Sequence, residues 1–212
     1  MNRFRIAVAA VLAVIMLSTC VLDAEAQRWR KRAQIIVPVD PQTPTIALLD
    51  TLVDHIEQND SLRVRRSPDD PQKYTAQEIS DLLLEEGLGV SSASHVFISY
   101  QFDLNRQGFK EQITNMYFVY RSGATSGEDD IPIMYVNARK SDWFTRLISQ
   151  KGTTGAHLMD LRTFRDQLAF ARVVRNMDAE VVRIGGEPVR EGRDRKKRQL
   201  INEITTLTYQ QR

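Results

Sequence analysis

The chain has 212 residues, of which 42% are hydrophobic and 26% are charged. This length supports one core-forming domain or two very small ones, and it excludes a multidomain enzyme. The 29 basic and 27 acidic residues leave a net charge of +2. That balance indicates no polyanionic partner by itself, and the composition is not that of a disordered, collagenous or disulfide-rich chain.

Residues 1–26 have the pattern of a secretory signal peptide. Two arginines precede an apolar run over residues 6–22, and Ala24 and Ala26 are the small residues that signal peptidase recognises. We therefore expect export of the protein and cleavage between Ala26 and Gln27.

Two other interpretations of this segment stay open. The apolar run is at the short limit for an uncleaved transmembrane anchor, and the basic residues after it favour holding that end on the cytoplasmic side. Lipoprotein processing at Cys20 would require Thr19 to stand where a smaller residue is usual. If cleavage follows Ala26, the mature chain has no cysteine and therefore no disulfide or thiolate metal site.

Two amphipathic helices are predicted in the first third of the mature chain. The first begins at Thr43 and Pro44, an N-cap and a favoured first helical residue, and its apolar residues recur at helical spacing up to Ile56. The second begins with a capping box formed by Thr75 and Glu78.

The hydrophobic period then changes to two, which predicts strands. A short strand is also consistent with residues 61–66, between the two helices. The strands over Val96–Leu104, Phe109–Arg121 and Ile131–Asn137 are joined by short links, so we expect them to form one antiparallel meander.

Helices are predicted for the remainder of the chain. A short one begins at Ser141 or Asp142, a longer one carries an apolar face over Leu161–Ala171, and Gly185-Gly186 interrupt before the last. The last helix places Leu200, Ile204 and Leu207 on one side. The predicted fold class is α+β, a small antiparallel sheet of three or slightly more strands with helices packed before and after it. The predicted organisation is a signal peptide (1–26), an α+β domain (27–189) and a charged amphipathic helix (190–212).

Charge is concentrated at both ends of the mature chain. Residues 27–32 and 190–198 carry +4 each, which leaves about −6 on residues 33–189. The ordinary interpretation is a pair of solvated termini, and the alternative is that both ends dock on acidic surfaces of neighbouring subunits. The candidate interface residues are Arg28, Trp29, Arg30, Lys31, Arg32, Arg195, Lys196, Lys197 and Arg198.

No motif for catalysis or for cofactor binding is evident. The three histidines have no partner at helical spacing, and no zinc-ligand pattern, nucleophile elbow or phosphate-binding loop is present. The basic cluster near residue 195 has no aromatic stacking platform beside it, which argues against nucleic acid. We therefore expect a non-enzymatic protein with no metal, cofactor, small-molecule substrate or nucleic acid partner.

Several segments, read in order, resemble the GldN/PorN family of gliding-motility and type IX secretion proteins. The similar stretches are Trp29–Arg32 ahead of 35–41, the helical segments 48–56 and 74–79, the strand segments 100–103 and 131–139, the helix 163–170 and the charged helix 193–209. The resemblance implies a non-enzymatic periplasmic protein. It also implies a large ring built with an outer-membrane lipoprotein, and contact with the periplasmic part of an inner-membrane motor protein.

Two alternatives to this function stay open. The helix-strand pairs over 43–66 and 78–102 are loosely similar to the small N-terminal domain of TolB-like envelope proteins, which would indicate a generic periplasmic binding module. The other alternative is a cryptic hydrolase, which should show a deep pocket with convergent polar groups.

The signal-peptide assignment is directly testable. Mass spectrometry of the exported protein is expected to find a mature N-terminus at Gln27, because Ala24 and Ala26 occupy the two positions that signal peptidase reads. A diacylated Cys20 at the N-terminus would contradict this prediction and would attach the protein to a membrane.

Overall fold

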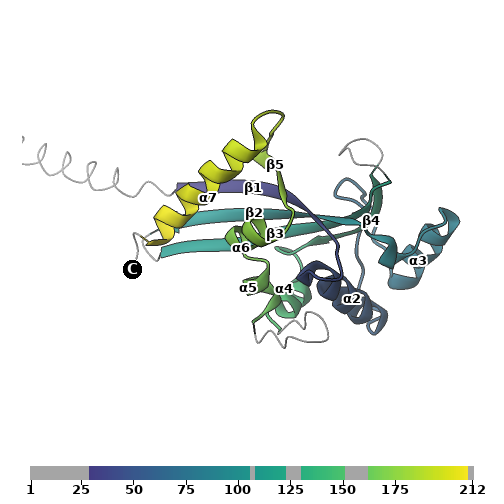
Figure 1. The fold of residues 1–212 in the computed structure, drawn as a ribbon. Helices are drawn as coiled ribbons and strands as arrows, with labels where there is room; N and C mark the ends of the chain where they lie inside the picture. The colour runs from purple at the N-terminus through teal and green to yellow at the C-terminus, as the bar shows by residue number, and fades with distance from the viewer. Residues whose placement is uncertain (1–28, 106–107, 123–129, 151–161, 210–212) are drawn as a thin grey trace, which may run out of the picture.

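A computed structural model describes residues 29–105, 108–122, 130–150 and 162–209. The described residues form an α+β fold with a six-stranded antiparallel sheet, six α-helices and one 3-10 helix (Figure 1). In chain order, the elements are β1 (Trp29–Pro38), α2 (Pro44–Glu57), α3 (Ala76–Glu85), η1 (Val90–Ser92), β2 (His95–Asn105), β3 (Gly108–Tyr120), β4 (Ile131–Asn137), α4 (Asp142–Ile148), α5 (Phe164–Gln167), α6 (Phe170–Asn176), β5 (Glu180–Ile184), β6 (Glu187–Pro188) and α7 (Arg193–Tyr209).

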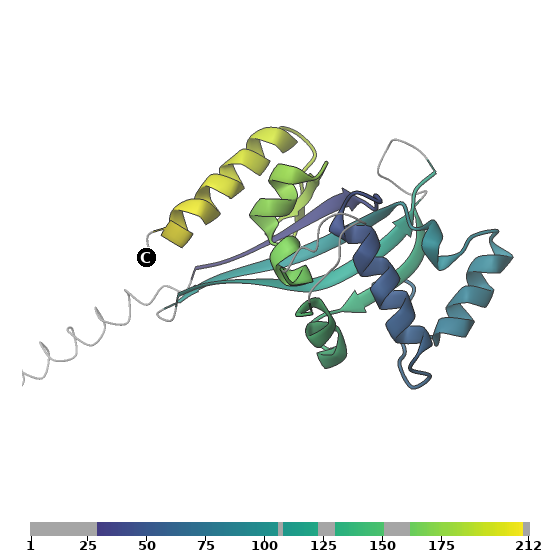
Figure 2. The same cartoon turned by 60° about the horizontal axis from the view of Figure 1, so that its bottom comes forward.

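The sheet is covered by helices on one side. Its strand order is β4-β3-β2-β1-β5-β6. Helices α2, α4, α5, α6 and α7 lie on the same side of it, whereas α3 lies beyond the end of the sheet near β4 (Figures 1 and 2). A bridge between Arg65 and Tyr135 and an ion pair between Arg66 and Glu86 join the α3 region to the edge of β4.

The predicted meander is confirmed, but the sheet is larger than the three strands expected. Strands β2, β3 and β4 are consecutive antiparallel neighbours. β1 was missed because its first half carries Trp29 and the three basic residues Arg30, Lys31 and Arg32, which indicated a charged end. Its inward positions, among them Ala33, Ile35 and Val37, alternate with outward ones and are buried.

The expected interruption at Gly185-Gly186 is instead the turn of a hairpin. The two glycines join β5 to β6 and have φ angles of 66° and 97°. A two-residue loop with both central residues at positive φ matches the twist of antiparallel strands, and glycine adopts it without steric cost. The remainder of the chain is therefore not wholly helical, since β5 pairs with β1.

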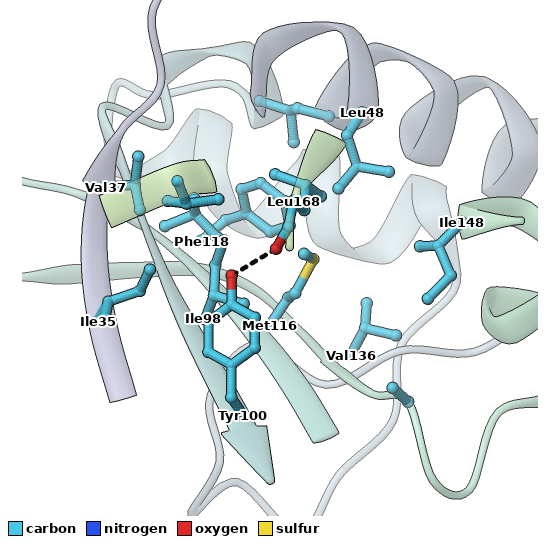
Figure 3. Packing of buried hydrophobic residues seen from close by; sticks show 14 of the residues in the cluster. Ile35, Val37, Leu48, Ile98, Tyr100, Met116, Phe118, Val136, Ile148 and Leu168 are labelled. Atoms are coloured by element: carbon cyan, nitrogen blue, oxygen red, sulfur yellow. Dashed lines mark hydrogen bonds between the residues drawn. The ribbon is translucent and has the colours of Figure 1, made fainter. Parts of the chain in front are cut away.

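The single helix expected over Leu161–Ala171 is two short helices, α5 and α6, and Leu161 lies outside the described residues. Side chains of the sheet stabilise the break between these two helices. The Tyr100 hydroxyl donates to the Leu168 carbonyl at 2.7 Å (Figure 3), and the Glu111 carboxylate accepts from the Phe170 backbone N–H at 2.7 Å. Two backbone groups that a continuous helix would pair internally are satisfied by side chains of β2 and β3 instead.

The core lies between the sheet and the helices. Tyr100 and Phe102 are fully buried, and both rings meet Phe170 edge-on at centroid distances of 5.4 and 5.3 Å. Of the predicted stripe on the last helix, Leu200 and Ile204 are buried. The same helix packs against β5.

Glu111 gives the fold a pH dependence. Desolvation raises the pKa of its carboxyl to about 7, outweighing the Phe170 hydrogen bond that favours the charged form. The folded state therefore binds more protons than the unfolded state between about pH 4.5 and about pH 7, so stability falls as pH rises through that range. In urea unfolding at several pH values, we expect Glu111→Gln to flatten this slope, because the amide keeps an acceptor for Phe170 and does not ionise.

The matched control is Glu57→Gln, which changes an exposed glutamate on α2 and should keep the wild-type slope. Equal slopes for wild type and Glu111→Gln would contradict the assignment of the pH dependence to this carboxyl.

Candidate functional site: the open face of the sheet

The side of the sheet opposite the helices is its most distinctive surface. Directly paired residues on neighbouring antiparallel strands point to the same side of a sheet. None of the described helices covers the second side (Figures 1 and 2). We call this second side the open face. Its side chains form rows that run across the strands.

The first row is polar and crosses five strands in register. Arg183 of β5 pairs with Gln34 of β1, which pairs with Ser99 of β2, Asn115 of β3 and Asn137 of β4 in turn. At about 4.8 Å between strands, the row spans roughly 19 Å. The Gln34 amide donates to the Ser99 hydroxyl at 3.2 Å. We call this set the polar row.

A cavity of about 330 Å³ opens over the polar row. Three exposed arginines, Arg32, Arg139 and Arg183, line it together with the amides and the serine of that row. Among the described residues, no carboxylate forms an ion pair with any of the three guanidinium groups. Unpaired guanidinium groups beside amide donors favour the binding of carboxylates or other anions.

A hydrogen-bonded network holds one wall of this cavity. Arg30 donates to Asp103 at 2.7 Å, Asp103 accepts from the Gln101 amide, and the Gln101 carbonyl oxygen accepts from Arg139. Gln101 and Asp103 are each only 5% exposed, although they lie on the open face. The network satisfies these buried polar groups and fixes Arg139 over the sheet.

Beside the polar row runs a second row, which is apolar and aromatic. Ile36 pairs with Phe97, Phe97 with Tyr117, and Tyr117 with Tyr135. The Phe97 and Tyr117 rings stack at 5.8 Å between centroids, and the Tyr135 ring meets Tyr117 edge-on. The three rings are partly exposed. We call this set the aromatic row.

Arg121, which directly follows β3, lies beside the aromatic row. The Arg121 guanidinium lies 6.0 Å from the centroid of the Phe97 ring and pairs with Asp130 at 2.8 Å. Because this ion pair is largely buried, Arg121 is already neutralised. Arg121 therefore adds no unpaired positive charge to the open face.

The lining of the cavity consists mainly of hydrogen-bond donors and acceptors. It contains Ser99 but no histidine, lysine or carboxylate that could take a proton from that hydroxyl. Within the described part of the chain, no cluster of histidine, cysteine or acidic residues could hold a metal ion, and no helix is long and apolar enough to cross a membrane.

The predicted N-terminal interface residues are divided between the two sides of the sheet. Ala26, Gln27 and Arg28 lie outside the described residues. Arg30 and Arg32 point to the open face, and only Arg32 lines the cavity. Trp29 packs partly buried against the core, and Lys31 reaches Glu203 of α7 at 2.5 Å on the helix side.

The predicted C-terminal interface residues lie on α7, away from the open face. Lys197 donates to the carbonyl oxygen of Ala179 at 2.8 Å, and Lys196 lines a shallow hollow that Lys31 also lines. Arg195 and Arg198 are exposed. The two basic segments therefore meet only at this hollow, through Lys31 and Lys196, and part of their charge is used inside the molecule.

Most residues of the open face were missed in the sequence. Their positions alternate with the apolar residues used to find the strands, so Ser99, Gln101 and Asn115 looked like ordinary solvent-facing positions. The signal available was that each of the strands β1 to β5 carries at least one outward amide or arginine, but the alignment of these residues needs the register. In comparisons with known proteins, no family model matches this sequence and no curated protein is significantly similar to it.

Replacement of Asp103 tests the network. We expect Asp103→Ala to lower the free energy of unfolding by about 1–3 kcal/mol, since the buried Gln101 amide and Arg30 lose their acceptor. Urea unfolding measures this. The control Asp178→Ala removes an exposed aspartate and should cost less than about 0.5 kcal/mol. Equal stability of the two variants would show that the network is not a structural support.

Proposed function

We propose that the protein is a non-enzymatic structural subunit of a periplasmic complex, of the kind that serves type IX protein secretion or gliding motility. The single observation that carries the proposal is the open face, where three arginines without carboxylate partners stand beside a row of partly exposed aromatic rings. Arginine and aromatic side chains are the residue types enriched at energetic centres of protein interfaces.

The partners follow from the resemblance to the GldN/PorN family. They are an outer-membrane ring lipoprotein and the periplasmic part of an inner-membrane motor protein, and the protein acts as part of an oligomeric assembly between them. The absence of a proton acceptor in the cavity lining supports an assembly role over hydrolysis. The exposed basic residues of α7 offer a second contact surface on the helix side.

A generic periplasmic binding module is the second candidate. The cavity of about 330 Å³ supports it, because a hollow of that size with convergent donors suits a small anion. The two candidates differ in what co-purifies with the protein from solubilised cell envelopes. A subunit is recovered in a large complex, whereas a binding module is recovered as a small soluble species.

Affinity purification from solubilised envelopes tests the proposal. The tagged protein is expected to co-purify with an outer-membrane lipoprotein and an inner-membrane motor protein in one high-molecular-weight fraction. Recovery of the protein alone, as a monomer, would refute the assembly role. Repetition at raised salt reports the electrostatic share of the contacts, since surface charge pairs are screened.

The double variant Arg195→Glu/Arg198→Glu refines this test. Both side chains are exposed, whereas Lys197 is bound to a backbone carbonyl and is left unchanged. We expect about tenfold weaker incorporation into the complex, the effect of roughly 1.4 kcal/mol. Arg146→Glu/Arg165→Glu makes the same change of net charge at exposed sites on α4 and α5. If both variants incorporate equally, the α7 surface is not a contact.

A further inference from the structure

Helix α3 carries an exposed surface whose chemistry is complementary to the open face. Leu84 is 66% exposed, and it is the one large hydrophobic side chain that is exposed among the described residues. Asp81 and Glu85 are also exposed and lie three residues before and one residue after it. Residues three and four apart share one face of a helix, so the three side chains form a single acidic and apolar stripe. We call it the α3 stripe.

The two carboxylates of the α3 stripe have no cation partner in the described structure. Helix α3 and its C-cap carry four acidic residues and no basic one. Glu78 is used in the capping box and pairs with Arg63, and Glu86 pairs with Arg66. Asp81 accepts only from the neutral Gln77 amide at 2.7 Å. The stripe therefore has negative charge available for another molecule.

The position of α3 directs this stripe away from its own sheet. Helix α3 lies outside the layer of helices that covers the sheet (Figures 1 and 2). Its inner side, with Ile79 and Leu83, is buried. The inner side and the Arg66–Glu86 pair fix α3 beside β4. The exposed stripe can therefore meet an open face only on a second molecule.

We propose that the α3 stripe of one copy docks on the open face of a second copy, so that subunits associate head to tail. Leu84 packs on the aromatic row, while Asp81 and Glu85 bind the arginines over the polar row. The inference rests on the proposed assembly function and names the surfaces by which this subunit contacts its own kind.

Charge complementarity selects this occupant. The only exposed large apolar side chain in the described structure is flanked by acids without a cation partner, and the open face has partly exposed rings beside arginines without a carboxylate partner.

Such an interface is heterologous, since it joins two different surfaces. After one contact forms, each pair still has one open face and one α3 stripe available. Association can therefore continue, and it ends only if the rotation between subunits closes a ring.

The experiment uses the purified mature protein and two variants. The face variant is Arg139→Glu/Arg183→Glu, and the helix variant is Asp81→Lys/Glu85→Lys. All four residues are exposed. By sedimentation at increasing concentration, wild type should form species larger than a monomer that dissociate at raised salt. Each variant alone should associate at least about tenfold more weakly, as expected when close charge pairs are reversed.

Mixing the variants gives the decisive result. The face variant keeps its α3 stripe and the helix variant keeps its open face, so these two native surfaces should bind in a mixture. The reversed face of the first and the reversed stripe of the second form an inverted pair, so copies of the two variants should associate in alternation. A chain that carries both sets of reversals should associate again through the inverted pairs. A mixture that stays monomeric, or a wild type that is monomeric throughout, overturns the inference.

Two controls separate this surface from general effects of charge. Asp50→Lys/Asp54→Lys reverses another exposed acidic pair with the same spacing on α2 and should associate like wild type. Leu84→Ser leaves all charges unchanged and should weaken association at low and at high salt. If the face variant weakens association while the helix variant and Leu84→Ser do not, the open face binds a different acidic surface and the inference fails.

The outcome is distinguishable from failure of the proposed function. A protein that recovers envelope partners in affinity purification but stays monomeric alone retains the assembly role and loses only this interface. A protein that self-associates as described but recovers no envelope partner loses the proposed complex and keeps the interface.

Discussion

The pairing of β1 with β2 on one side and β5 on the other is the interaction on which the rest of the structure depends. Because the strand order is β4-β3-β2-β1-β5-β6, the meander and the C-terminal hairpin belong to one sheet only through β1. Its inward residues Ala33, Ile35 and Val37 complete the floor beneath the helices. Its outward residues Arg32 and Gln34 line the cavity. One strand therefore supports both the core and the candidate site.

The open face exists because each strand separates two sets of residues by the alternation of its backbone. On the helix side, Ile98, Tyr100 and Phe102 are buried, and the intervening Ser99 and Gln101 lie on the other side. A slip of one residue in any pairing would exchange the two sets. The register shifts between β2 and β3 and between β1 and β5 absorb irregular spacing, and the polar row remains aligned across five strands.

The sequence was sufficient for elements whose pattern is local. Helix α2 with Thr43 and Pro44, the capping box of α3 and the three strands of the meander were all predicted near their observed places. The features that the sequence did not predict depend on contacts between residues far apart in the chain. The basic residues of β1 resemble a tail until Asp103 and Glu203 neutralise two of them. The break between α5 and α6 is set by Tyr100 and Glu111, which local helical periodicity cannot reveal. The candidate site forms only when five strands pair in register. The sequence therefore showed the types of its residues but did not show that they form one site.

The central place of the first strand also governs the order in which the molecule can form. Ile35 of β1 pairs with Ile98 of β2 and with Val181 of β5. The pairing of β1 with β5 therefore joins a strand near the beginning of the described chain to one near its end. Such non-local pairings are slow to close, because the entropy of joining distant segments is lost before the contacts repay it. The meander of β2, β3 and β4 can assemble early as a local unit. The sheet is completed only after β5 has become available, and until then the strand edges and the apolar face of the partial sheet stay exposed to factors that bind incompletely folded chains.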